Sequence, residues 1–144
     1  MPRGGARMIK GLWNIGIKTD NLEEEVDFLR RVGAKVVLRE RFDAGEGTSL
    51  EYAILRLGGV RMLLFPKTIF EDRIEGGVPP GLTHAVYEVD DLETEYQRIK
   101  ALGAQVLVEP REISAGFGRR KLAFFRSPGG LAFEIMQILE DRLS

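Results

Sequence analysis

Strand-like and helix-like patterns follow one another in the same order twice along the chain. Two segments rich in β-branched and aromatic residues, Trp13–Lys18 and Thr83–Val89, predict strands. Apolar residues then recur at helical spacing, which predicts helices from Leu22 to Val32 and from Leu92 to Leu102. Three more strands are expected after each helix: Lys35–Glu40, Ser49–Leu57 and Val60–Pro66 in the first half, and Gln105–Glu109, Arg119–Arg126 and Leu131–Ile138 in the second.

The signals that start and stop these elements are also repeated. A capping box is expected at the start of each helix and a terminating glycine after its end: Asp20 with Glu23 and then Gly33, Asp90 with Glu93 and then Gly103. Glycine pairs, Gly58-Gly59 and Gly129-Gly130, join the last two strands of each half as hairpins.

The repetition extends to residue identity. Shifted by 70 positions, the window Gly11–Val36 matches Gly81–Val106 at nine of 26 positions. Chance at average composition gives about two. The chain is therefore an internal duplication.

Each copy has the order βαβββ, which predicts an α+β fold of two tandem modules. One face of each sheet is covered by a helix, and the other faces a cup enclosed by a curled mixed sheet or half-barrel. We expect an N-terminal arm at residues 1–9, the first module at 10–66, a linker at 67–80 and the second module at 81–144.

Composition excludes several classes of function. Net charge is −1, so no global field attracts nucleic acid. No apolar run approaches the roughly 20 residues of a membrane helix, and MPRGGARMIK lacks the apolar core of a secretory signal. Without cysteine the chain forms no disulfide or thiolate site, which favours a cytoplasmic protein. Two Asn, three Gln and 30% charged residues lean toward a thermophile.

Two motifs carry a family resemblance over about residues 10–140. They are G-L-x-H-x-x-x-x-V-D-D-L-E at Gly81–Glu93 and F-R-S-P-G-G-x-x-x-E at Phe125–Glu134. The chain resembles the vicinal oxygen chelate superfamily, with glyoxalase I, methylmalonyl-CoA epimerase, extradiol dioxygenases and the bleomycin resistance proteins. Members of that family usually have Asp before the proline, where this chain has Ser127.

The resemblance implies metal ligands on the first and last strand of each module. By position these are Asn14 and Leu63 in the first copy, and His84 and Glu134 in the second. Leucine binds no metal, and His84 is the only histidine. A two-histidine iron site of the extradiol dioxygenase type and a four-ligand zinc or nickel site are therefore disfavoured. The expected ligands of any divalent ion, Zn, Ni, Mn, Fe or Mg, are His84 and Glu134.

Three interpretations of His84 and Glu134 stay open. In the first interpretation, His84 is a structural residue of the cup wall, and its ring nitrogens form hydrogen bonds with Glu134 or with a backbone carbonyl, as is common for a single inward-facing histidine. Alternatively, the two residues hold a metal completed by water, substrate or Asn14. Or they form a metal-free proton-transfer pair, which suits an epimerase, isomerase or lyase.

Strand alternation predicts the lining of the cup. If His84 faces inward, so do the substrate-binding candidates, which are Asn14, Arg61, Leu63, Phe65, Val86 and Met136. The basic segment GFGRRK, Gly116–Lys121, is interpreted as a solvated hairpin end; the alternative is a grip for a carboxylate or phosphate.

These observations leave two classes of function. The first is a glyoxalase-like enzyme, a lyase or isomerase acting on a small oxygenated substrate through His84 and Glu134, with a degenerate or absent metal site. The second is a metal-free protein that sequesters a ligand without turnover, as bleomycin resistance proteins do. The resemblance also implies a homodimer. The expected partner is a small molecule, with no nucleic acid and no membrane.

Overall fold

The computed structural model describes residues 9–45 and 48–143, without the side chains of 42–49. The expected N-terminal arm lies outside this description except for Ile9. The elements are β1 (Ile9–Lys18), α1 (Leu22–Val32), β2 (Lys35–Gly45), β3 (Thr48–Leu57), β4 (Val60–Phe65), η1 (Glu71–Arg73), β5 (Gly81–Val89), α2 (Leu92–Ala101), β6 (Gln105–Ala115), β7 (Gly118–Arg126) and β8 (Ala132–Asp141).

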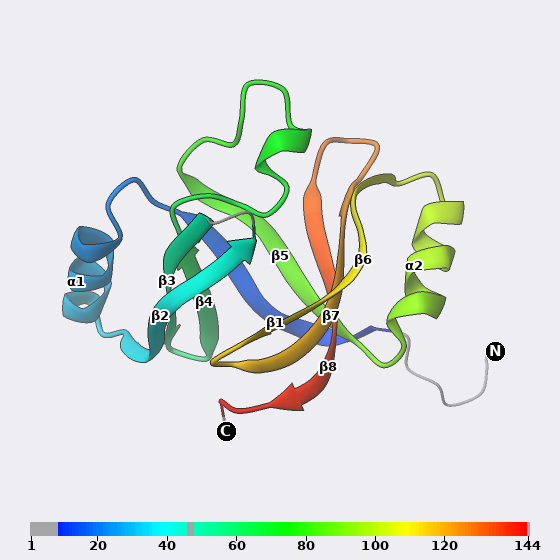
Figure 1. Cartoon of the computed structure of the whole chain (residues 1–144). Coiled ribbons are helices and arrows are strands. Elements are labelled where there is room, and N and C mark those ends of the chain that lie inside the picture. The colour runs from blue at the N-terminus through cyan, green and yellow to red at the C-terminus, as the bar shows by residue number, and fades with distance from the viewer. Residues whose placement is uncertain (1–8, 46–47, 144) are drawn as a thin grey trace.

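One eight-stranded mixed sheet connects the two halves in the order β2-β3-β4-β1-β5-β8-β7-β6. β1 is parallel to β4 and β5 is parallel to β8, so each half repeats the same arrangement. The halves join where β1 pairs antiparallel with β5. The sheet curls into a half-barrel with the helices on its outer side (Figure 1). The predicted α+β fold of two βαβββ modules is confirmed, and the two modules pair within one chain.

Apolar packing divides between the two sides of the sheet. Outside, α1 buries Val26 in a cluster with Leu55 and Leu64, and α2 buries Leu92 with Ile135. Inside the cup, one cluster is built around Phe70 and Phe124 and another around Tyr52, Ile54 and Phe65. The inner clusters narrow the cup to the small cavity described below.

The helix caps differ by one residue from the predicted ones. Asn21 accepts a hydrogen bond from the Glu24 amide, and Asp91 accepts one from the Thr94 amide. Asp20 and Asp90 lie one residue before these caps, because the chain is still extended at Asn21 and Asp91. Gly33, with a φ of 133°, ends α1 as predicted.

The β6–β7 hairpin is longer than predicted. β6 continues beyond Glu109 to Ala115, and β7 begins at Gly118. Only Gly116 and Phe117 remain as the turn, so most of the segment expected to be a solvated hairpin end is strand. Its tip reaches across to the first half, where the Gly116 amide donates to Oε2 of Glu40 at 2.7 Å.

The linker folds over one end of the cup (Figure 1). Its centre is Glu71, whose carboxylate accepts from Lys18 Nζ at 2.8 Å and from the backbone amides of Thr68 and Val78. Lys18 Nζ also donates to the Val78 carbonyl oxygen at 2.6 Å. These bonds hold Phe70, which is 1% exposed, against the inside of the sheet.

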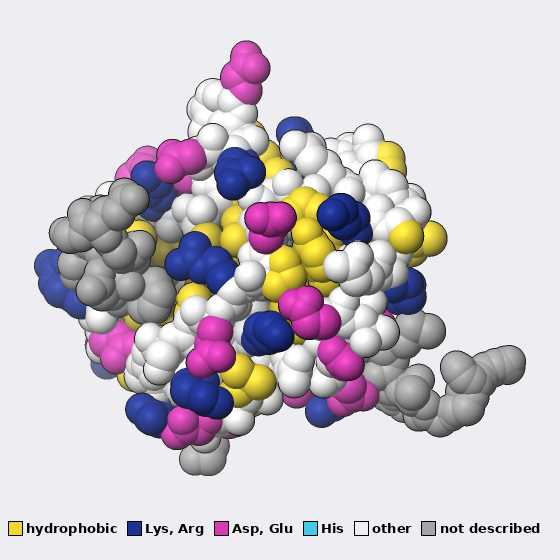
Figure 2. Space-filling model, turned by 45° about the vertical axis from the view of Figure 1, so that its right-hand side comes forward, with side chains coloured by type: hydrophobic (Ala, Val, Ile, Leu, Met, Phe, Trp, Pro, Cys, Tyr) yellow, Lys and Arg dark blue, Asp and Glu magenta, His cyan; other side chains and the backbone are white. Residues whose placement is uncertain are grey.

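Charges of both signs are interspersed with apolar patches on the face shown in Figure 2. No histidine surface is visible there, in keeping with the 8% exposure of His84. Within the described residues, no helix is long and apolar enough to cross a membrane.

Candidate functional site

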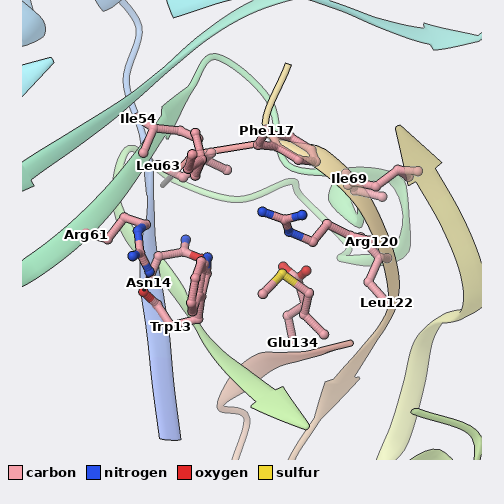
Figure 3. A pocket seen from close by; sticks show the side chains of 13 residues that line it. Trp13, Asn14, Ile54, Arg61, Leu63, Ile69, Phe117, Arg120, Leu122 and Glu134 are labelled. Carbon is pink, nitrogen blue, oxygen red and sulfur yellow. Dashed lines mark hydrogen bonds between the residues drawn. The ribbon is translucent and has the colours of Figure 1, made fainter. Parts of the chain in front are cut away.

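A cavity of about 80 Å³ lies inside the cup. Apolar and aromatic side chains make up most of its wall, and the polar side chains are those of one Asn, one Glu and two Arg. Its lining is formed by Trp13, Asn14, Ile54, Arg61, Leu63, Ile69, Ile113, Phe117, Arg120, Leu122, Glu134, Met136 and Leu143. Figure 3 shows Arg120 reaching toward the middle of this space, with Glu134 below it and Trp13, Asn14 and Arg61 on the opposite wall.

The predicted site residues separate into two groups. Asn14, Arg61, Leu63, Glu134 and Met136 line the cavity. The other three lie behind its wall: His84, Phe65 and Val86, all 8% exposed or less. The sheet therefore brings three of the four family ligand positions to the cavity, and the histidine is not one of them.

His84 and Glu134 form a bonded pair. Nε2 of His84 lies 3.3 Å from Oε1 of Glu134, and Nδ1 lies 2.7 Å from Oγ1 of Thr83. The tautomer with its proton on Nε2 satisfies both contacts, because Nε2 then donates to the carboxylate and Nδ1 accepts from the hydroxyl. His84 is thus positioned to orient Glu134.

Three aromatic rings surround the imidazole. Phe65 stacks on it with ring centroids 6.0 Å apart. Phe70 and Phe124 make edge contacts with it, with ring centroids 5.4 and 5.2 Å from that of the imidazole. The side chain of His84 is only 3% exposed as a result. Phe70 comes from the linker, to which the sequence analysis gave no role in the site.

Gly16 leaves space for the imidazole on the neighbouring strand. It pairs with His84 across β1 and β5, and a Cβ at this position would lie 2.4 Å from Cε1 of the ring. Because Phe65, Phe70 and Phe124 enclose the ring, it has little room to move aside.

We expect Gly16→Ala to destabilise the protein by about 1–3 kcal/mol, the usual cost of overpacking a core. The measurement is urea denaturation followed by circular dichroism. Gly59→Ala is the matched control, since an added Cβ there meets nothing within 4 Å. Equal midpoints for the two variants would show that the His84 ring is free to shift.

Burial raises the pKa of Glu134 above the ordinary range of a carboxyl group, and the hydrogen bond and charge of His84 oppose that shift. A carboxyl group with a raised pKa both accepts and donates protons closer to neutral pH. Glu134 is therefore a candidate general acid or base, and it lines the cavity.

Arg120 was not foreseen as a site residue. It is 2% exposed, and it lies on the face of β7 that also carries Leu122 and Phe124. Nη1 donates to the Glu140 carbonyl oxygen at 2.5 Å, and Nη2 to Asp141 Oδ1 at 3.2 Å. Assigning Arg120 to a solvated hairpin end was wrong, because strand alternation turns it inward between Arg119 and Lys121.

Trp13 also enters the lining unexpectedly. The register of β1 against β5 shifts between Leu12 and Asn14, so Trp13 is the extra residue of an irregularity in the pairing. Such an irregularity locally breaks the alternation of faces. Trp13 and Asn14 both reach the cavity for this reason, and the Arg61 guanidinium lies 3.6 Å from the Trp13 ring centroid.

The four family ligand positions do not fit a divalent ion held by the protein alone. Leu63 offers no donor atom, and both ring nitrogens of His84 already have partners. Among the described residues, no three His, Cys, Asp or Glu side chains come together as a cluster that could hold a metal. A two-ligand site on His84 and Glu134 stays a prediction, and it requires the pair to separate.

The fold has many solved counterparts. A methylmalonyl-CoA epimerase from Mycobacterium tuberculosis matches with a TM-score of 0.71 at 17% identity, over 96% of this chain and 94% of its own. A Streptomyces coelicolor methylmalonyl-CoA epimerase in complex with 2-nitronate-propionyl-CoA matches with a TM-score of 0.70 at 18% identity, over 92% and 99%.

A 4-hydroxymandelate synthase from Streptomyces coelicolor matches with a TM-score of 0.67 at 17% identity, over 94% of this chain but 49% of its own. No curated protein matches by sequence. The model of the Glyoxalase/Bleomycin resistance protein/Dioxygenase superfamily matches residues 11–135, which is most of the chain. The chain therefore belongs to this superfamily.

Proposed function

We propose that this protein is a small-molecule enzyme of the isomerase or lyase type that transfers a proton next to a carbonyl group. Glu134 is the catalytic acid and base, and His84 is its positioning residue. The observation that carries the proposal is that Glu134 faces a cavity while its other side is bonded to a buried histidine.

The chemistry follows from this geometry. The Glu134 carboxylate takes a proton from the carbon beside the substrate carbonyl; the C–H bond breaks, an O–H bond forms, and negative charge moves to the carbonyl oxygen. The Arg120 guanidinium lines the same cavity and supplies positive charge for that oxygen. Return of the proton from Glu134 to a neighbouring carbon, with the double bond shifted accordingly, completes an isomerisation.

The similar structures favour this class of reaction. Two of them are named as methylmalonyl-CoA epimerases, and an epimerase changes the configuration at one carbon. At 17–18% identity they support the type of chemistry and leave the substrate of this chain open. No step of the proposal needs a metal ion, in line with the unsuitable donor set.

A metal-free binding protein without turnover is the second candidate. The observation that favours it is the closed environment of His84: its ring is surrounded by Phe65, Phe70 and Phe124, and both nitrogens are bonded. A satisfied pair of this kind also occurs in cores with no catalytic role.

The test is hydrogen exchange in a bound carbon acid. The protein is incubated in D2O with 2-oxo acids of three to six carbons, pyruvate and 2-oxobutyrate among them, and loss of the C–H signal beside the carbonyl is followed by proton NMR. Exchange well above that in buffer supports the enzyme. Binding by thermal shift with no added exchange supports the sequestering protein, and absence of binding contradicts both.

Metal dependence is measured in the same assay. We expect the exchange rate and the melting temperature to stay unchanged when chelator is added. A chelator-dependent loss of both, with about one divalent ion per chain by mass spectrometry, would instead assign His84 and Glu134 to a metal site.

Homodimer formation, a cytoplasmic location and a thermophilic source also stay predictions.

A further inference from the structure

Two guanidinium groups line the cavity, one of them buried and the other half-buried. Arg120 lies on β7 within the β6–β7 hairpin, with its side chain 3% exposed and its guanidinium carbon 5.1 Å from the Phe117 ring centroid. Arg61 is half-buried on the opposite wall, stacked on Trp13. Aromatic faces and the apolar wall hold both planar groups in place, so little side-chain freedom remains to be lost on binding a ligand.

The positive charge of the cavity is only partly compensated. Asp141 pairs with Arg120 at 3.2 Å. Among the residues that the structure describes, no carboxylate oxygen lies within 4.0 Å of the Arg61 nitrogens, whose one hydrogen bond goes to the Trp13 carbonyl oxygen. Glu134, the acidic residue of the lining, is bonded to His84 instead.

Burial is the largest influence on both arginines and lowers their pKa, and the neighbouring Arg56 lowers that of Arg61 further, while the charges of Asp141 and Glu88 offset part of this shift. A guanidinium in this position gains more from an anionic partner than one in water does, because the competing hydration is already reduced. The cavity therefore favours a negative ligand over a neutral one of the same shape.

We propose that the cavity is selective for small organic anions, with the ligand's carboxylate on Arg61 and Arg120 and its short apolar part against Leu63 and Met136. The inference rests on the proposed function, since it names the substrate class of the same site. For the enzyme it means a carboxylic acid that carries its reactive C–H within reach of Glu134.

The size of the cavity limits the ligand. An engineered cavity of about 150 Å³ holds benzene, so about 80 Å³ suits an acid of only a few carbon atoms. A longer ligand would extend beyond this cavity, past the hairpin tip beside it. That tip is bonded through the Gly116 amide to Glu40, which also accepts from the Tyr52 hydroxyl.

The test compares shape-matched ligands that differ in charge. Affinities of pyruvate and 2-oxobutyrate are measured against pyruvamide and 2-oxobutyramide by calorimetry at constant ionic strength. We expect at least about tenfold tighter binding of the acids, in line with the strength of hydrogen bonds to charged groups. Equal affinities for acid and amide would overturn the anion selectivity.

Arg61→Gln is the principal variant, because its side chain is half-buried and its removal leaves no carboxylate unpaired. We expect it to weaken binding of the acids by about 10- to 100-fold and to leave binding of the amides unchanged. Arg30→Gln, an exposed position on α1, is the control for net charge. Arg61→Lys is a second variant that keeps the positive charge but loses the planar guanidinium, so it separates the contribution of charge from that of bidentate geometry.

The two proposals fail in different ways. Acids that bind more tightly than amides, yet show no C–H exchange, support the anion site and contradict the enzyme. Exchange of acids and amides at equal rates and affinities supports the enzyme and contradicts the anion site. Loss of binding in Arg30→Gln as large as in Arg61→Gln would point to a general effect of charge and sink the assignment to this cavity.

Discussion

We expect Glu134→Gln to abolish most of the substrate-dependent exchange while the protein stays folded and still binds its ligand. The amide has the shape of the carboxylate and retains an oxygen that accepts from His84 Nε2, so the pair survives. It does not accept the substrate proton, which costs about 10²–10⁴-fold in rate for a general base. The rate is measured by proton NMR in D2O, and ligand affinity by calorimetry.

The pH profile separates this role from a structural one. Because burial raises the pKa of Glu134, the exchange rate of the native protein should rise with pH through a value above the ordinary carboxyl range. Glu112→Gln, at an exposed position on β6, is the matched carboxylate control and should keep the native rate and profile. Glu134→Gln retaining more than about a tenth of the native rate would refute the catalytic role.

The duplicated pattern was sufficient to predict the fold. Nine identities at a constant shift fixed two equivalent units, and strand and helix periodicity gave their order. The spacing of apolar residues does not show how the two modules pair with each other. The β1–β5 contact depends on two edge strands that lie 70 residues apart, and no local signal reports whether such edges meet within one chain or between two.

The site was predictable only in part. The family resemblance placed Asn14, Leu63 and Glu134 on first and last strands, and all three line the cavity, whereas Phe65 and Val86, expected there from strand alternation, do not. Arg120 was missed because its charge suggested an exposed side chain. Strand alternation would have placed it on the same inward face as Leu122 and Phe124. Trp13 was missed for a different reason, since an irregularity in strand pairing is not visible in the residue pattern.

The linker is the clearest case of a functional element without a sequence signal. Its glycines and prolines predicted a connection, and the structure shows that it carries Phe70 to the His84 ring. Glu71 holds that loop through Lys18 and backbone amides. The environment of the His84–Glu134 pair therefore depends on an ionised carboxylate outside the cavity.

The stability of the protein should fall between pH 4.5 and about 2 because of Glu71. Burial alone would raise the pKa of its carboxyl group, but the hydrogen bonds from Lys18, Val78 and Thr68 outweigh it and lower the pKa from 4.5 to about 2. A depressed carboxyl pKa contributes stability above pH 4.5, and the contribution is lost as the pH falls toward 2. Its size is about 3 kcal/mol, from about 1.4 kcal/mol per pKa unit.

Urea denaturation from pH 7 to pH 2 measures this contribution by comparison with Glu71→Gln. The variant should be about 3 kcal/mol less stable at pH 7, because Lys18 then lacks its carboxylate. The difference should shrink below pH 4.5 and be mostly lost near pH 2, where about half of the native carboxyl groups are protonated. Glu75→Gln, exposed in the same linker, is the control and should follow the native curve throughout. A gap of constant size across the whole range would mean that the carboxylate charge does not hold the loop, and that Phe70 stays on His84 by packing alone.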